Sequence, residues 1–303
     1  DPGTAVRLNP RFASPDLIVF FVGLLVAAGL HARRVRGSIL WGILTAGALA
    51  ILLKLLLPHL DAELVGTPLI AESALVNRFE IADRVVDAPP SLAPTLLQMD
   101  VRGALTLAMA PIVAIFLFMV FFDTVGTLVG VAQQAGLMRD DRLPRARQAF
   151  VSDAVGTVAG AALGTSTVTS YIESATGVEQ GGRTGLTAVT VAVLFLLALF
   201  FSPIVAMFGG YAPVTAPALV IVGGMMLRNV QHLDWDDYTE VLPAFLVLIG
   251  IPLSYSIADG LALGFVAYPL VKVLGGRARD VRWVSWLVAV LLLGYFVLVR
   301  SRI

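Results

Sequence analysis

The sequence has 303 residues, with no cysteine and only three histidines. The absence of cysteine excludes disulfide bonds, thiolate metal sites and a cysteine nucleophile. The histidines, His31, His59 and His232, stand at the ends of apolar segments or between them, so we expect no metal site. Charge is also scarce, because only 14% of the residues are charged and the formal net charge is +0. Nothing in this balance indicates binding to nucleic acid.

Apolar residues are abundant instead. They make up 58% of the chain, and the mean hydropathy is +0.88. A membrane core about 30 Å thick is crossed by a helix of about 20 apolar residues. We therefore predict an all-α polytopic membrane protein. The expected helical segments are 16–32, 37–57, 108–131, 148–164, 184–207, 214–228, 240–256 and 257–275, followed by an apolar tail at 283–299 that we expect to lie at the membrane interface.

The beginning of the chain and the positions of its arginines indicate how these segments are arranged. Residues 1–4 contain neither an initiator methionine nor the basic region of a signal peptide, so we expect a fragment of a longer protein. The polar stretch 58–103 is expected to form a long extramembrane loop. Short cytoplasmic loops collect arginine. Counting crossings places the following arginines in the cytoplasm: Arg33, Arg34, Arg36, Arg139, Arg142, Arg145, Arg147, Arg183, Arg228, Arg277, Arg279 and Arg282.

Residues 165–180 interrupt the pattern of spanning helices. The hydroxyl-rich run 165–170 disfavours a helix and favours a short strand. Residues 171–180 then provide about ten helical residues, roughly 15 Å or half the membrane, before Gly181-Gly182 ends the helix. Irregular backbone at membrane depth needs protein or a wet cavity to satisfy its peptide groups. We therefore predict a half-helix whose free N–H groups face a cavity, as at the substrate sites of many secondary transporters.

Asp123 and Glu173 are carboxylates inside these otherwise apolar stretches. A charge at membrane depth costs about 3 kcal/mol even on lenient scales, so it usually faces a cavity and has a function. Thr127 follows Asp123 by one helical turn and shares its face. Two structural alternatives stay open: Asp123 could hydrogen-bond to another helix, and Ser170 to Glu173 fits an S-x-x-E capping box. We predict that both acids line one solvated cavity.

Other polar and small residues have structural interpretations. The sequence Asp153 to Thr157 echoes Asp123 to Thr127, which we interpret as chance, with Asp153 acting as a helix cap or ion-pair partner. Glycines four residues apart indicate closely packed helices rather than catalysis. They are Gly126 and Gly130, then Gly156, Gly160 and Gly164, and finally Gly260 and Gly264.

Four longer stretches carry a resemblance to a known family. They are residues 122–128 (FDTVGTL), 164–174 (GTSTVTSYIES), 181–185 (GGRTG) and 254–260 (SYSIADG). Together they resemble the signature regions of the adenine, guanine and hypoxanthine permeases, which belong to the wider nucleobase and ascorbate transporter superfamily. The similarity covers nearly the whole chain, with the motifs in the family's order.

The resemblance implies a fold of fourteen membrane segments in two inverted repeats of seven, divided into a core domain that carries the substrate and a gate domain that forms dimer contacts. This chain is similar to the last two thirds of that fold. The implied divisions are gate helices at 1–57 (the sixth and seventh segments), an extramembrane loop at 58–103, the core with the substrate site at 104–207, further gate helices at 208–275, and a basic turn with an apolar tail at 276–303.

The resemblance also implies roles for individual residues. Asp123 and Glu173 are expected to hold the nucleobase, and Thr127 to help in proton coupling. Many relatives have glutamate at the position of Asp123 and histidine at that of Thr127. The shorter aspartate leaves room for a two-ring purine, and the missing histidine leaves Asp123 and Glu173 as the candidates for the coupling proton. The remaining implied substrate contacts are Thr169, Ile172 and Ser174.

The predicted function is secondary active import of purine nucleobases by proton symport, with elevator-type alternating access, in the plasma (bacterial inner) membrane. The expected partners are a purine, the lipid bilayer and a second copy of the chain, without nucleic acid, and with no cofactor besides H⁺. An anion or other small-solute transporter or channel of related fold is the alternative, although it would favour a basic or neutral residue in place of Glu173. An intramembrane aspartyl protease would need Tyr-Asp and Gly-x-Gly-Asp contexts, and neither occurs. We therefore expect that this protein is not an enzyme.

Overall fold

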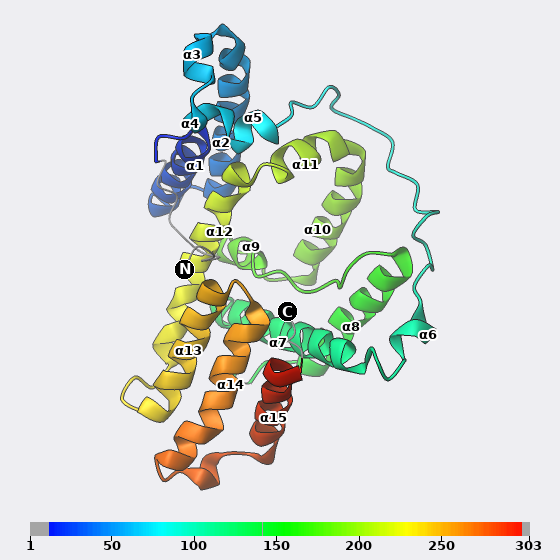
Figure 1. Cartoon of the computed structure of the whole chain (residues 1–303), viewed down its shortest axis with the longest axis vertical. Helices are drawn as coiled ribbons and strands as arrows, with labels where there is room; N and C mark the ends of the chain where they lie inside the picture. Colours follow the sequence, from blue (N-terminus) through cyan, green and yellow to red (C-terminus); the bar gives the residue numbers. More distant parts are fainter. Residues whose placement is uncertain (1–11, 141, 299–303) are drawn as a thin grey trace.

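The computed structural model describes residues 12–140 and 142–298, and this part of the chain is helical with irregular connections (Figure 1). Six of its helices are long and apolar enough to cross a membrane. The predicted all-α, multi-pass membrane protein is therefore confirmed. The elements are α1 (Pro15–Ala32), α2 (Ser38–Leu56), η1 (Leu57–His59), α3 (Ala62–Val65), α4 (Pro68–Ala71), α5 (Ala74–Asn77), α6 (Val101–Ala104), α7 (Ala110–Gln134), α8 (Ala146–Leu163), α9 (Ser174–Glu179), α10 (Gly185–Ala198), η2 (Leu199–Phe201), α11 (Ser202–Gly209), α12 (Ala212–Met226), η3 (Leu227–His232), α13 (Tyr238–Ser254), α14 (Ile257–Leu274), η4 (Ala278–Asp280) and α15 (Trp283–Leu298).

The helix boundaries follow from capping residues in the sequence. Ser14 caps α1, since its side chain accepts a hydrogen bond from the Leu17 amide at 3.4 Å, and Pro15 occupies the first helical position. Ser256 caps α14 in the same way, accepting from the Asp259 amide at 3.2 Å. Each long predicted segment therefore begins and ends close to an observed helix. Residues 1–11 and 299–303, which belong to the first and last predicted divisions, lie outside the described residues.

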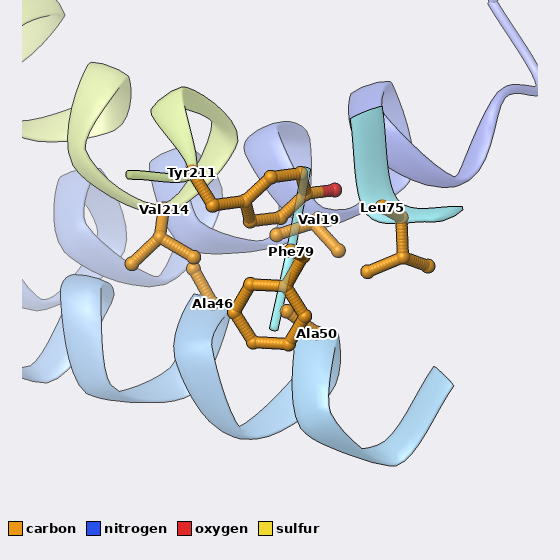
Figure 2. Close-up of a cluster of buried hydrophobic side chains, with 7 residues drawn as sticks. All are labelled: Val19, Ala46, Ala50, Leu75, Phe79, Tyr211 and Val214. Atoms are coloured by element: carbon orange, nitrogen blue, oxygen red, sulfur yellow. The ribbon is translucent and has the colours of Figure 1, made fainter. Parts of the chain in front are cut away.

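Helices α1, α2 and α12 pack together around a buried apolar cluster. Figure 2 shows its members, which come from these helices, from α5 and from the segments beside them: Val19, Ala46, Ala50, Leu75, Phe79, Tyr211 and Val214. The rings of Phe79 and Tyr211 lie 4.9 Å apart. Small residues let α1 and α2 approach closely, because a Cβ atom on Gly42 would come within 2.6 Å of the Ala27 methyl group.

The short helix α5 is held by charged side chains at both ends. The Asp16 carboxylate accepts hydrogen bonds from the first two amides of α5 at 2.7 and 2.9 Å, and from the Tyr211 hydroxyl at 2.7 Å. The Lys54 ammonium donates to two carbonyls of the same helix at 3.0 and 2.9 Å. A carboxylate at the N-terminus and a cation at the C-terminus both match the helix dipole. The first part of the 58–103 loop is thereby fixed to α1 and α2.

The far part of the same loop lies on the end of α8. The Leu97 amide donates to the Ala162 carbonyl at 2.8 Å, and the Thr95 hydroxyl donates to the Leu163 carbonyl at 3.0 Å. These bonds satisfy carbonyls that the helix end leaves free. Gly164 follows with a φ of +83°, and a Cβ atom there would lie 2.6 Å from the Thr95 carbonyl oxygen. Glycine at 164 is therefore required both by its conformation and by the close approach of the loop.

Helix α14 packs against both α13 and α15, its neighbours in the sequence. A Cβ atom on Gly260 would meet the Ile251 backbone, and one on Gly264 would meet the Pro243 carbonyl oxygen at 2.8 Å. The predicted close packing at these two glycines is confirmed. It is wrong for Gly126, where a Cβ atom would meet no other atom within 4 Å among residues 12–140 and 142–298.

A small ionic network joins the ends of α13 and α14. The Lys272 ammonium, whose side chain is 5% exposed, lies 2.7 Å from a Glu240 carboxylate oxygen and 3.4 Å from one of Asp237. Arg277 also pairs with Asp237. The Thr239 hydroxyl donates to the Asp237 carboxylate at 2.6 Å, and this bond is the largest cause that lowers the pKa of Asp237 to about 2. Asp237 is also the N-cap of α13, so it serves both the helix end and the network.

We expect Asp237→Asn to lower the thermal stability of the protein by a few degrees at neutral pH. The folded-state pKa of about 2 lies below the ordinary value of 3.8, so the ionised form stabilises the fold above the ordinary value. This contribution is lost as the pH falls through the folded-state pKa. The difference in melting temperature between Asp237→Asn and the unaltered protein, both in detergent, should therefore become smaller as the pH falls towards about 2. Asp236→Asn, which changes an exposed neighbour, is the control and should melt like the unaltered protein at every pH.

Candidate functional site

The segment between α8 and α9 is irregular, as predicted, and is held in place by side chains of α8. The Thr157 hydroxyl donates to the Val168 carbonyl at 2.7 Å. Val168 in turn packs on α8 where Gly156 has no side chain, since a Cβ atom there would lie 3.5 Å from Val168. Residues 165–171 form no β-ladder, so the predicted short strand is wrong. The reason is that backbone groups of this segment are bonded to side chains rather than to a neighbouring strand.

Asp153 joins three parts of this region. One of its carboxylate oxygens accepts from the Ser170 amide at 3.0 Å and from the Ser170 hydroxyl at 3.2 Å. The other accepts from the hydroxyl of Thr124 on α7 at 2.8 Å. Asp153 therefore connects α7, α8 and the irregular segment through three donors. The interpretation of Asp153 as a helix cap or ion-pair partner is wrong, because it lies inside α8 and these donors are neutral.

A hollow of about 310 Å³ lies beside Asp153. This volume is at the lower end of the range of small-molecule sites, which is about 300–1,000 Å³. A carboxylate, hydroxyl groups and apolar side chains meet there, as they do at sites for small polar ligands. The residues that line it are Leu128, Ala149, Ser152, Asp153, Gly156, Val168, Thr169 and Ser170. Thr169 is the one predicted contact among them, while Asp123 and Glu173 do not line this hollow.

Asp123 and Thr127 differ in their surroundings although they share α7. The Asp123 side chain is exposed, and no hydrogen bond or ion pair to it occurs in the described part of the chain. Thr127 is buried, with 6% of its surface exposed. Thr124 is 3% exposed and carries the bond to Asp153. The side of α7 that carries Thr124 therefore faces α8.

Glu173 stands at the N-cap position of α9 and is half-buried. The capping-box alternative is wrong, because the Ser170 hydroxyl bonds to Asp153 and no side chain in the described part of the chain caps α9. Within residues 12–140 and 142–298, the Glu173 carboxylate has no hydrogen-bond or ionic partner. Helices α7 and α9 pack against each other, so Asp123 and Glu173 are on neighbouring helices, with no bond between the two carboxylates in the same ranges.

The helix after the break is shorter than predicted. It has six residues, which corresponds to roughly 9 Å instead of half the membrane. Its first amides are also not free. The amides of Ser174, Ala175 and Thr176 donate to the carbonyls of residues 171, 172 and 173 at 3.2, 3.0 and 3.0 Å. The expectation that free N–H groups of this helix face a cavity is therefore wrong for these three groups.

The residue that sequence reasoning missed is Asp153. Its signal in the sequence is the echo between Asp153 to Thr157 and Asp123 to Thr127, and the interpretation of this echo as chance is wrong. In the structure these two stretches of the chain are in contact, because the Thr124 hydroxyl of one donates a hydrogen bond to the Asp153 carboxylate of the other. No group of three or more His, Asp or Glu side chains in the described ranges is arranged to hold a metal ion.

Comparison with known proteins gives consistent results. A family model with the description "Permease family" matches residues 5–263. The adenine permease AdeP of Escherichia coli (strain K12) is 42% identical over 92% of this chain and 57% of its own length. Two guanine/hypoxanthine permeases of Bacillus subtilis (strain 168) are also similar: PbuO is 38% identical over 88% of this chain and 57% of its own length, and PbuG is 36% identical over 99% and 63%. The chain thus spans less than two thirds of each of these relatives.

Proposed function

Because this chain belongs to the xanthine/uracil permease family, we propose that the protein imports purine nucleobases across the plasma membrane together with protons. Adenine, guanine and hypoxanthine are the proposed substrates. The single observation that carries this proposal is the similarity of this chain, over most of its length, to proteins named adenine permease or guanine/hypoxanthine permease. The helices of membrane length and the irregular segment with its adjoining hollow support it.

The proposed roles of the residues follow from their chemistry. Guanine and hypoxanthine carry N–H groups that can donate hydrogen bonds to an ionised carboxylate. Adenine presents a hydrogen-bond acceptor beside a donor, and a protonated carboxyl group offers the matching donor and acceptor. Glu173 and Asp123, which have no partner in the described ranges, are available for such bonds. We assign substrate binding to Asp123, Glu173, Thr127 and Thr169, with Ile172 and Ser174 beside them. Asp153 fixes the irregular segment that carries Thr169, Ile172 and Glu173.

One of the two free carboxyl groups is also the proposed carrier of the coupling proton. A carboxyl group can bind a proton and release it again, as a coupling group must. Proton binding together with substrate would neutralise the site before the core moves past the gate helices. Such an elevator movement, and dimer contacts through 1–57 and 208–275, are parts of the same proposal.

Uptake measurements test this function directly. The full-length protein, expressed in cells that lack their own purine importers, should take up radiolabelled adenine or hypoxanthine. Unlabelled purines should compete with this uptake, and an uncoupler should stop it. Uptake that purines do not affect but chloride does would favour the anion-transport alternative. Purine uptake that follows a sodium gradient and ignores the uncoupler would contradict proton coupling.

A further inference from the structure

One end of the 58–103 loop is inserted into the helices that we assign to the gate. The side chains of Leu75 and Phe79 are 0% and 1% exposed, within the cluster that also includes residues of α1, α2 and α12 (Figure 2). Asp16 of α1 and Lys54 of α2 hold the two ends of α5 by hydrogen bonds of 2.7–3.0 Å. Buried apolar side chains and charge-assisted hydrogen bonds both stabilise this attachment. The loop up to Phe79 therefore moves with the gate helices.

The other end of the loop is bonded to elements that we assign to the core. The Asp87 amide donates to the Phe200 carbonyl of η2 at 2.9 Å. Further along the chain, the Thr95 hydroxyl donates to the Leu163 carbonyl at the end of α8 at 3.0 Å. The loop from Asp87 onwards is therefore attached to the core.

Residues 80–86 lie between these two attachments, and we call them the tether. They form no helix or strand, and Figure 1 shows the chain leaving α5 as an open trace towards α6. An extended chain gains about 3.5 Å per residue, so the Cα atoms of Phe79 and Asp87 can separate by no more than about 28 Å. The tether is not fully extended here, because the chain bends within it and the Arg84 guanidinium lies 3.2 Å from the Asp87 carboxylate. It therefore holds slack in this conformation.

We propose that the tether limits how far the core travels past the gate helices during transport, so this inference rests on the proposed function. As the core moves away from the gate attachment, the tether straightens, and its full length ends the movement. Straightening meets little resistance, because both side chains of the Arg84–Asp87 pair are exposed and exposed ion pairs contribute little to stability. The limit itself is firm, because it is set by covalent geometry.

A reversible disulfide can shorten the tether after the protein has folded. The chain contains no cysteine, so Ile81→Cys with Val86→Cys introduces a single pair, at two exposed positions. A disulfide holds two Cα atoms about 5.5 Å apart, whereas the extended chain between these positions spans about 17 Å. Oxidation thus removes about 12 Å from the reach of the tether, and a reductant restores it.

The matched control is Ala88→Cys with Ala93→Cys. These exposed positions are equally far apart in the sequence. Both ends of their stretch, Asp87 and Thr95, are attached to the core. A disulfide there shortens the same loop without shortening the connection between gate and core.

We expect oxidation of the 81–86 pair in the full-length protein to lower purine uptake about tenfold, because conformational steps often limit turnover. Reduction should restore uptake, and the 88–93 pair should transport equally in both states. Normal uptake by the oxidised 81–86 protein overturns the proposal. Failure of the 81–86 pair to oxidise also overturns it, because a tether with slack lets these two positions meet.

A distance measurement tests the tether without purine transport. Spin labels on Leu60→Cys, beside the gate helix α2, and Leu199→Cys, in η2 of the core, report the separation of the two parts in lipid vesicles. Deleting residues 81–83 should remove the longest separations, whereas replacing them by Gly-Ser-Gly, which keeps the length, should retain them. An unchanged longest distance after the deletion overturns the proposal.

The two measurements distinguish a failure of the tether from a failure of the proposed function. Loss of the longest distance in a protein that takes up no purine would support the tether and contradict purine transport. Purine uptake that is indifferent to the 81–86 disulfide would contradict the tether and leave the function standing.

Discussion

Replacing Asp153 by alanine is expected to reduce purine uptake by about a hundredfold. The substitution removes the acceptor of three hydrogen bonds, from the Ser170 amide, the Ser170 hydroxyl and the Thr124 hydroxyl. A donor left without a partner costs at least about 1 kcal/mol. Three such losses total about 3 kcal/mol, which corresponds to about two powers of ten in rate. The initial rate of radiolabelled hypoxanthine uptake, divided by the amount of protein in the membrane, measures this effect.

Two further variants separate the bonds of Asp153 from its charge. Asp153→Asn keeps an oxygen that can accept from Ser170, so it should retain more uptake than the alanine variant. Asp280→Ala removes an exposed carboxylate in η4, far along the chain from the hollow, and should leave uptake unchanged. If Asp153→Ala is present at the normal level and transports normally, then these bonds do not determine the geometry of the site.

Glu173→Gln is expected to give the second large effect, in which purine uptake falls about 10- to 100-fold and what remains no longer responds to an uncoupler. Glutamine is close to glutamate in shape but carries no titratable proton and no charge. It therefore forms weaker hydrogen bonds to the N–H groups of a purine than a carboxylate does. Uptake with and without an uncoupler, measured over a range of external pH, reports both changes.

The matched control lies on the same short helix. Glu179→Gln removes a carboxylate at the other end of α9, where it lies 3.8 Å from His31. We expect this variant to keep both its uptake and its response to the uncoupler. An uncoupler effect in Glu173→Gln as large as in the unaltered protein would exclude Glu173 as the proton carrier and leave Asp123 as the candidate.

The long helices could be predicted from the sequence because membrane-spanning segments have few alternatives. Every peptide group in the hydrocarbon core must be bonded within the segment, so an apolar run of sufficient length forms a helix. The ends are then set by local chemistry, such as Ser14 before α1 with Pro15 as its first residue, and Asp237 before α13. These signals act over three or four residues and are visible in the sequence alone.

The candidate site was less predictable because groups that are distant in the sequence compete with local groups for the same hydrogen bonds. The sequence correctly indicates a break after Gly164, since a run of hydroxyl residues opposes helix formation there. It also suggests that Ser170 caps the following helix with Glu173, three residues away. In the structure Asp153, which is 17 residues away, binds both the amide and the hydroxyl of Ser170 instead. The helix therefore begins later, at Ser174.

The contact between Thr95 and Gly164 constrains exchange of segments between related permeases. The polar loop 58–103 supplies the groups that complete the end of α8, and Gly164 leaves room for them because it has no side chain. A chimaera that takes residues 58–103 from one parent and residues 146–174 from another would combine two surfaces that evolved apart. Recombination points on either side of both segments should give folded hybrids more often than a point between them.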